Sequence, residues 1–307
     1  MTDKVGIWLR ALRVNQWTKN AVVFVAWFFA VADASQAVAA RGVRPFLLVC
    51  LMALSFSLVS SAFYLLNDVS DYDADRLHPV KKLRPVAADL VSKIDAVRMA
   101  LALFAVGIAF PCYLVMRHPD RTGGILVLLL YTVMQCAYSG FLKRLPYVDV
   151  AVIAAGFVLR AVAGAAVIAA RISPWLLACA FLLSLFLALC KRRHELVLAS
   201  ESRAALKGYH PVVLDGLIFA AAAATVGVYA CYTLAADTVS RFGTRGLGFT
   251  TVFVALGVAR YLKLVYGRNA GDVGRPERVL LTDKLLWLIL TGYGLTALGA
   301  VLLVRLA

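Results

Sequence analysis

The chain has 307 residues, of which 62% are hydrophobic and only 16% are charged, and its formal net charge at pH 7 is +15. This composition excludes an ordinary soluble domain and predicts an integral membrane protein, because a soluble surface of this size needs more polar side chains. Lys and Arg in cytoplasmic loops beside anionic lipid account for the positive charge, and no nucleic-acid-binding motif accompanies it.

Residues 1–19 form the first predicted element, a short helix at the membrane interface. Apolar and basic side chains alternate along it, namely Ile7, Trp8, Leu12 and Trp17 with Arg10, Arg13 and Lys19. Such alternation is typical of a helix that lies in the headgroup region of the lipid.

Nine apolar runs follow, each near the roughly 20 residues that a membrane span requires. They are residues 20–39, 45–66, 97–117, 123–141, 148–170, 173–190, 212–235, 246–266 and 284–304. An N-terminus in the cytoplasm places most Lys and Arg on the inner side, in agreement with the positive-inside rule. We therefore expect one all-α polytopic domain over residues 1–307. Its long cytoplasmic loops are predicted at 67–96, 191–211 and 267–283.

The loop after the second predicted span begins with a concentration of acidic side chains. If this stretch is helical, Asp68, Asp71 and Asp75 share one face, whereas Asp73 points away from them. Carboxylates on one stripe repel each other unless a hard cation lies between them, and oxygen ligands suit Mg²⁺. The alternative is a solvated helix end, but Lys and Arg are the usual residues at a membrane boundary.

Cations follow directly, as His78, Lys81, Lys82 and Arg84. Carboxylates that can hold a metal, followed by a cationic run, form the combination that a diphosphate substrate needs.

The junction of the fourth and fifth predicted spans carries a second set of polar residues. Lys143 and Arg144 by themselves favour a role in membrane topology. Asp149 opens an apolar helix that also contains Arg160, eleven residues and roughly 16 Å further along the same face. A charge inside a span indicates a functional site, and the alternative is an ion pair with another helix. Gly156 and Gly164 lie near that face and permit close packing.

Two further groups of charges lie on the same predicted side of the membrane. Lys191, Arg192 and Arg193 end the sixth predicted span, where they fit either a phosphate clamp or a charged helix end in which Lys191 pairs with Glu195. The acidic residues of the 267–283 loop indicate a substrate lid or a helix cap, and they are Asp272, Glu277 and Asp283.

Several motifs resemble a known family. The sequence Asn67-Asp68-x-x-Asp71-x-x-x-Asp75-Arg76 after a membrane helix resembles the first aspartate motif of the UbiA-type intramembrane prenyltransferases. The family's second DxxxD motif is incomplete here, because Ile153 stands four residues after Asp149. Other segments resemble the decaprenyl-phosphate phosphoribosyltransferase branch, and they are Asn15-Gln16-Trp17-Thr18-Lys19-Asn20, Asp75-Arg76-x-His78-Pro79-x-Lys81-x-x-Arg84-Pro85, Tyr138-Ser139-x-x-Leu142-Lys143, Lys191-Arg192-x-x-Glu195-Leu196 and residues 271–283.

The resemblance implies a transferase with 5-phosphoribosyl-1-diphosphate as donor and polyprenyl phosphate as acceptor. It implies Mg²⁺, with Mn²⁺ as a substitute, on Asp68, Asp71 and Asp75, and a catalytic role for these residues together with Lys81 and Arg84. The residues expected to bind substrate are Lys19, Asn67, Lys82, Tyr138, Lys143, Asp149, Arg160, Lys191, Arg192 and Glu195. The expected location is the inner (plasma) membrane with the active site facing the cytoplasm, in the synthesis of envelope polysaccharide.

Two other functions compete with this one. Prenyl transfer from a prenyl diphosphate to an aromatic or other small acceptor is typical of the wider superfamily. Two features argue against prenyl transfer: the second carboxylate of the DxxxD motif is missing after Asp149, and the cations are more numerous than one diphosphate needs. A transporter of anionic lipid would show repeated halves with broken helices, which the sequence lacks. Self-association into a homo-oligomer stays open.

Overall fold

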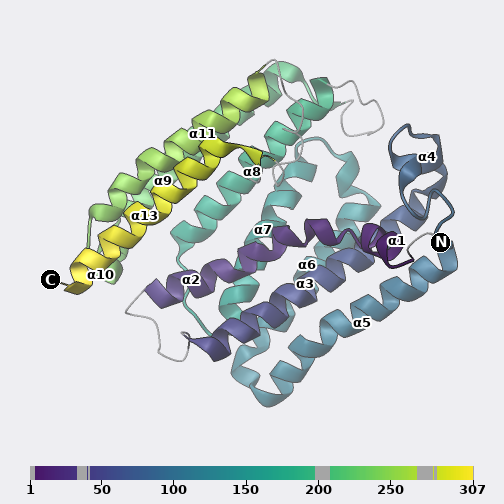
Figure 1. Ribbon diagram of the computed structural model, residues 1–307, viewed down its shortest axis with the longest axis horizontal. Coiled ribbons are helices and arrows are strands. Elements are labelled where there is room, and N and C mark those ends of the chain that lie inside the picture. The colour runs from purple at the N-terminus through teal and green to yellow at the C-terminus, as the bar shows by residue number, and fades with distance from the viewer. Residues whose placement is uncertain are drawn as a thin grey trace. The chain divides into compact units, whose positions relative to one another are not determined.

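The structure is a computed structural model that describes residues 4–32, 40, 42–197, 208–267, 279 and 282–306. Its regular elements are all helical, with no strand in these ranges (Figure 1). They are α1 (Lys4–Ala11), η1 (Val14–Phe24), α2 (Val25–Ala32), α3 (Val43–Ser70), α4 (Tyr72–Leu77), η3 (Lys81–Leu83), α5 (Lys93–Arg117), η4 (Pro119–Arg121), α6 (Thr122–Gly140), η5 (Leu142–Arg144), α7 (Val148–Val167), α8 (Pro174–Val197), α9 (Pro211–Leu234), α10 (Ala236–Phe242), η7 (Gly246–Phe249), α11 (Thr250–Tyr266) and α13 (Lys284–Leu306).

Eight helical segments among the described residues are long and apolar enough to cross a membrane. They coincide with the second to ninth predicted spans, and the predicted all-α membrane fold is confirmed. The first predicted span, residues 20–39, overlaps η1 and α2, and its residues 33–39 lie outside the described ranges. The count of nine spans and the cytoplasmic N-terminus therefore stay predictions.

The helices form two compact units, each with its own core. Unit 1 comprises residues 1–28, 38–140 and 159–170, and unit 2 comprises 29–37, 141–158 and 171–307. The continuous helix α7 contributes its first half to unit 2 and its second half to unit 1. This grouping neither confirms nor contradicts the predicted single domain over residues 1–307, which stays a prediction.

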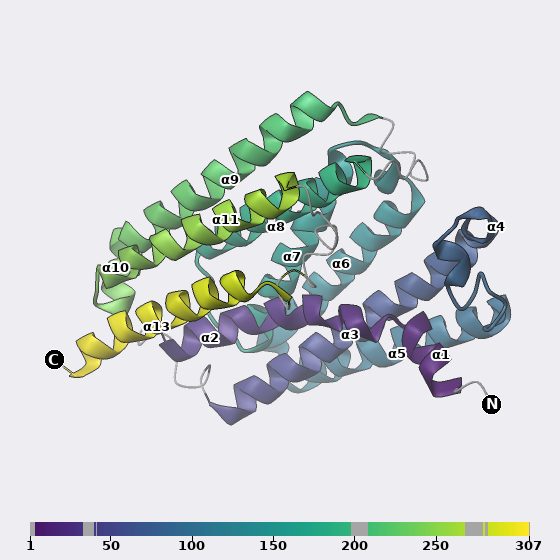
Figure 2. The same cartoon turned by 45° about the horizontal axis from the view of Figure 1, so that its top comes forward.

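Close packing in unit 1 depends on small residues. Helices α3 and α5 run side by side (Figures 1 and 2), and a Cβ added to Gly107 of α5 would lie 3.2 Å from the Ser55 carbonyl oxygen of α3. The contact at Gly164 of α7 is closer still, because a Cβ there would lie 1.9 Å from the carbonyl oxygen of Val23 in η1. Gly164 therefore permits close packing as predicted, and its neighbour is the main chain of η1.

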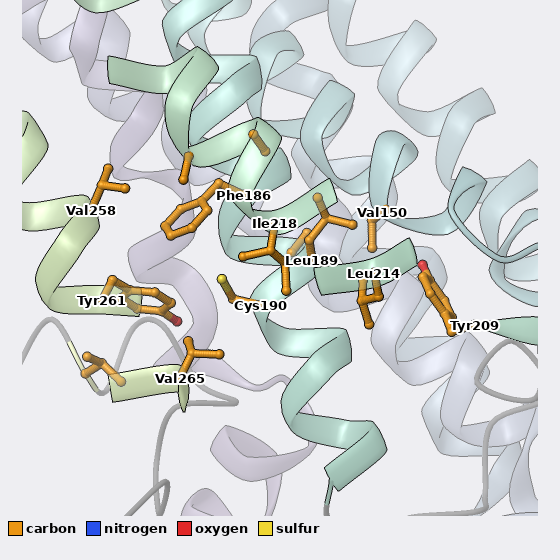
Figure 3. Close-up of a cluster of buried hydrophobic side chains, with 14 of the residues drawn as sticks. Val150, Phe186, Leu189, Cys190, Tyr209, Leu214, Ile218, Val258, Tyr261 and Val265 are labelled. Atoms are coloured by element: carbon orange, nitrogen blue, oxygen red, sulfur yellow. The ribbon is translucent and has the colours of Figure 1, made fainter. Parts of the chain in front are cut away.

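The core of unit 2 is built mainly from α8, α9 and α11. Figure 3 shows Phe186 and Cys190 of α8 between Tyr261 of α11 and Ile218 of α9, with Leu189 and Leu214 in the same cluster. The ring of Phe186 meets that of Tyr261 edge to face, with centroids 5.7 Å apart. These contacts fix the C-terminal half of α8, which carries the cationic run predicted from the sequence.

Candidate active site

The acidic residues of unit 1 lie where α3 ends and α4 begins. Asp68, on the last turn of α3, is 1% exposed, and Asp75 of α4 is 2% exposed. Asp71 is half-buried at the junction, and Asp73 is exposed, as its position off the stripe predicts. Buried carboxylates at a helix junction require cationic or hydrogen-bonding partners, because an isolated buried charge is very unfavourable.

Arg84 joins these two carboxylates. Its Nη1 atom donates to Oδ2 of Asp75 at 2.5 Å and to Oδ1 of Asp68 at 3.1 Å. The ammonium of Lys81 lies 3.9 Å from Oδ1 of Asp75. Four of the five residues expected to be catalytic are thus neighbours: Asp68, Asp75, Lys81 and Arg84. The chain between Asp68 and Arg84 turns back through α4 and η3 and so brings Arg84 to Asp68.

Arg13 is a member of this cluster that the sequence reasoning assigned only to the interfacial helix. Its guanidinium donates to Oδ1 of Asp68 and lies 4.7 Å from the centre of the Tyr64 ring. The backbone of Arg13 is left-handed, with φ at 52°, and this turn between α1 and η1 directs the chain back over α3. Burial lowers the pKa of Arg13 below its ordinary value, although Asp68 opposes that shift.

The N-terminal segment is fixed on α3 by polar and apolar contacts. Trp17 donates from its indole nitrogen to the Ser61 hydroxyl at 3.0 Å, and that hydroxyl donates to the Leu12 carbonyl oxygen at 2.8 Å. Ile7 and Ala11 of α1 share a buried cluster with residues of α3, the loop after Arg84 and α5. Helix α1 is therefore held against α3, which explains how Arg13, 55 positions from Asp68, reaches it.

His78 has a different role from the cationic one expected of it. Its Nδ1 atom accepts hydrogen bonds from the backbone N–H groups of Val80 (3.1 Å) and Lys81 (3.2 Å). Burial and the neighbouring Lys81 lower the pKa of His78 below its usual value, which favours the neutral ring that such acceptance requires. The imidazole thus orients the turn that carries Lys81.

This geometry predicts different outcomes for two substitutions of His78. An Asn side-chain oxygen can accept a hydrogen bond from the backbone two residues ahead, as Nδ1 does. His78→Asn should therefore leave the KM for the diphosphate substrate within about threefold of the wild-type value. His78→Ala leaves two backbone donors without their acceptor, which costs on the order of 1–3 kcal/mol. We expect it to raise donor KM about tenfold in steady-state assays. Equal effects of both substitutions would contradict this role.

The residues predicted around Asp149 form a separate buried cluster in unit 2. Asp149 accepts from the Tyr209 hydroxyl at 2.5 Å and from Nε of Arg192 at 2.8 Å, and Nη1 of Arg192 donates to Glu195 at 2.5 Å. Asp149 and Arg192 are each 1% exposed. Burial and Asp149 raise the pKa of the Tyr209 hydroxyl, which keeps it a donor. This is the ion pair with another helix that the sequence left open for Asp149.

Arg160 lies in unit 1 and is buried in a hydroxyl- and amide-rich network. It donates to Oδ1 of Asn20 at 2.7 Å and to the Tyr131 hydroxyl at 2.9 Å. Asn20 in turn donates to Ser57 at 2.8 Å, so η1, α3, α6 and α7 meet at this point. Asn20 belongs to the N-terminal motif quoted from the sequence, but no charge or spacing marked it as a partner of Arg160.

The remaining predicted residues are more accessible. Lys82 is exposed and the others are half-buried: Lys19, Asn67, Tyr138, Lys143 and Lys191. The Lys19 ammonium donates to Gln16 at 3.1 Å. Asp272 and Glu277 lie outside the described residues, whereas Asp283 accepts the Leu286 N–H at 2.9 Å and thereby caps α13. A hydrogen bond from Arg260 lowers the pKa of Asp283.

The donor set at the end of α3 fits a hard divalent cation. Oδ1 of Asp68 and Oδ2 of Asp75 converge on one nitrogen of Arg84, so a cation already joins them. Within the described ranges no three His, Cys, Asp or Glu side chains converge as a complete metal site. Two protein carboxylates with substrate phosphates completing the coordination is the usual arrangement for Mg²⁺.

Helical fold and acidic cluster together define a class of membrane transferase. The profile of the UbiA prenyltransferase family matches residues 21–280, and the chain belongs to this family. The resemblance drawn from the motifs is confirmed, because several relatives with the name decaprenyl-phosphate phosphoribosyltransferase are similar to this chain over most of its length. The protein of Corynebacterium glutamicum is 34% identical over 282 residues, covering 91% of this chain and 81% of its own. That of Mycobacterium tuberculosis strain H37Rv is 32% identical over 299 residues, with coverages of 95% and 93%.

Solved structures agree on the fold. A UbiA homolog from Archaeoglobus fulgidus bound to DMAPP and Mg²⁺ superposes with a TM-score of 0.69 at 18% identity, over 96% of this chain and 98% of that one. The same homolog bound to GPP and Mg²⁺ gives a TM-score of 0.68 at 19% identity, covering 96% of both chains. These structures confirm the expected fold, and the named relatives confirm the classification as a transferase.

Proposed function

We propose that the chain transfers the 5-phosphoribosyl group of phosphoribosyl diphosphate to a polyprenyl phosphate and releases pyrophosphate. The observation that carries the proposal is the buried pair Asp68 and Asp75, joined by Arg84 and flanked by Lys81. Relatives named decaprenyl-phosphate phosphoribosyltransferase, at 32–34% identity over most of their length, support this choice of donor and acceptor.

In the proposed reaction an oxygen of the lipid phosphate attacks C1 of the ribose. The bond from C1 to the diphosphate oxygen breaks, and its electron pair leaves with pyrophosphate. Attack from the side opposite the leaving group inverts C1 and gives a β-linked product. A lipid monophosphate is already anionic near neutral pH, because its second pKa is about 6, so no general base is needed.

The protein's task is electrostatic. Asp68, Asp71 and Asp75 would hold Mg²⁺, which neutralises charge on the departing pyrophosphate, and Mn²⁺ is expected to substitute for it. Lys81 and Arg84 would stabilise the same charge from the protein side, an electrostatic contribution that is often worth several kcal/mol. Their contacts with Asp75 place both cations beside the proposed metal ligands.

The other substrate contacts are proposed from position and exposure. Accessible polar groups would bind the two remaining phosphates and the ribose, and they are Lys19, Asn67, Lys82, Tyr138, Lys143 and Lys191. Arg160 is proposed as a binding residue deeper in unit 1. Asp149, Arg192 and Glu195 engage one another in the described structure, so we propose that they act by positioning Lys191.

The proposed setting follows from the family and the spans. We propose a multi-pass protein of the inner (plasma) membrane, forming one domain over residues 1–307 with its active site toward the cytoplasm. The product would supply an activated pentose for envelope polysaccharide. Short loops on the outer side leave space for a homo-oligomer.

A direct assay tests the proposal. The purified protein in detergent or lipid receives Mg²⁺, phosphoribosyl diphosphate labelled in the ribose, and polyprenyl phosphate. We expect the label to enter the organic-extractable lipid with one pyrophosphate released per transfer, and EDTA to abolish it. Transfer of label from a prenyl diphosphate to an aromatic acceptor, without phosphoribosyl transfer, would overturn the proposal in favour of prenyl transfer.

A further inference from the structure

The acidic site has an inner anionic layer and an outer cationic layer. The side chains of Asp68 and Asp75 are both 2% exposed, whereas those of Arg13 and Arg84 are 21% and 29% exposed. A ligand that approaches from solvent therefore meets guanidinium groups before it meets carboxylates. Both arginines extend from connections between helices, at the α1–η1 turn and after η3, where a side chain can reorient without moving a span.

The ligand oxygens that a metal would use are already engaged. Oδ1 of Asp68 accepts from both Arg13 and Arg84, and Oδ2 of Asp75 accepts from Arg84. Mg²⁺ binds carboxylate oxygens at about 2.0–2.1 Å. A metal ion on Oδ1 of Asp68 and Oδ2 of Asp75 would compete with Arg84 for both oxygens and with Arg13 for the same oxygen of Asp68.

Charge determines when this exchange is favourable. Arg13, Lys81 and Arg84 pair with Asp68 and Asp75, and a third carboxylate, Asp71, acts on Asp68 electrostatically, so three cations already balance three carboxylates. A divalent ion alone adds positive charge and leaves the displaced guanidiniums without a carboxylate. A diphosphate that enters with the metal supplies a polyanion to which both guanidiniums can bind, and bidentate contacts to phosphate suit arginine especially well.

We infer that Arg13 and Arg84 are exchangeable counter-ions, which hold Asp68 and Asp75 before the metal binds and transfer to the diphosphate when it does. Metal and diphosphate then raise each other's affinity, because coupling between two ligands is reciprocal. The inference rests on the proposed function for the identity of the diphosphate-bearing substrate. It adds a diphosphate-binding role for Arg13 and makes the metal site weak until substrate is present.

The test measures binding, not transfer. Free Mn²⁺ is followed by electron paramagnetic resonance while the full-length protein in detergent is titrated, with and without inorganic pyrophosphate. Because pyrophosphate also chelates Mn²⁺ in solution, variants are compared at identical concentrations of free Mn²⁺ and of free pyrophosphate. We expect Mn²⁺ alone to bind wild type weakly. Pyrophosphate should raise the affinity of the protein for Mn²⁺ by at least about tenfold, within the usual 5–150-fold range of such couplings.

Three substitutions separate exchange from general charge effects. Arg84→Gln and Arg13→Gln should each tighten binding of Mn²⁺ alone by about threefold or more and reduce the coupling with pyrophosphate, since a competitor and a partner are both lost. The matched control is Arg76→Gln, which removes one positive charge beside Asp75 on a side chain that contacts Tyr72 and Asp89. It should leave both quantities within about twofold.

Each outcome decides the question. No coupling in wild type, or equal effects of all three substitutions, would overturn the inference even if phosphoribosyl transfer is intact. If the wild-type protein transfers no phosphoribosyl group but shows the expected binding pattern, the proposed function is overturned and the exchange of counter-ions still stands. If Arg84→Gln does not elute as a folded protein, Arg13→Gln serves instead, because Asp68 then keeps Arg84 as its partner.

Discussion

Replacing Asp75 by Asn should lower phosphoribosyl transfer by about 10²–10³-fold, the usual loss when one strong electrostatic contact of a transition state is removed. The substitution keeps the size of the side chain but removes one proposed metal ligand and the carboxylate that holds Arg84 and Lys81. We expect Asp68→Asn to have an effect of the same order, because Asp68 is equally buried and shares Arg84. Initial rates at saturating Mg²⁺ measure both.

Asp73→Asn is the matched control for this prediction. Asp73 lies two residues away on the same short helix α4 but is exposed, and its loss should leave the rate within about twofold. The melting temperature in detergent separates a catalytic loss from unfolding, because removing a buried partner of Arg84 also destabilises the protein. Comparable losses at Asp73 and Asp75, or full activity of Asp75→Asn, would contradict the proposed metal site.

The parts of this site that could be predicted are those set by local periodicity. Helical spacing placed Asp68 and Asp75 on one side and Asp73 away from them, and the structure shows two buried residues and one exposed residue in that pattern. Spans were predictable for the same reason, since about 20 consecutive apolar residues mark each helix. A place for Arg84 near the carboxylates was also predictable, because it lies only sixteen positions after Asp68 in the sequence.

Contacts between distant segments were not predictable in this way. Arg13 reaches Asp68 through a left-handed turn, and nothing in the periodicity of either segment encodes that approach. His78 looked like one more cation, because the two backbone donors that make its Nδ1 an acceptor depend on the turn geometry. For Asp149, the sequence offered an ion pair or a site, and the choice of Arg192 as partner required the packing of α7 against α8.

The buried pair in unit 2 leads to the second large effect. Arg192→Met should lower the free energy of unfolding by about 3–5 kcal/mol, the usual result of removing one partner of a buried salt bridge. The reason is that Asp149 and Glu195 would both lose a cation whose side chain is 2% exposed, and the hydrogen bond from Tyr209 to Asp149 neutralises no charge. Denaturant titration in detergent measures the change.

The neighbouring residue gives the control. Arg193 also has a carboxylate partner, Asp215, but their side chains are 25% and 33% exposed, so Arg193→Met should cost less than about 1 kcal/mol. The comparison also decides between the two interpretations of the cationic run in α8. A stable Arg192→Met protein with a strongly raised donor KM would show that Arg192 clamps phosphate directly. A destabilised protein whose remaining folded fraction keeps its donor KM would show that Arg192 acts by holding α7 and α8 together.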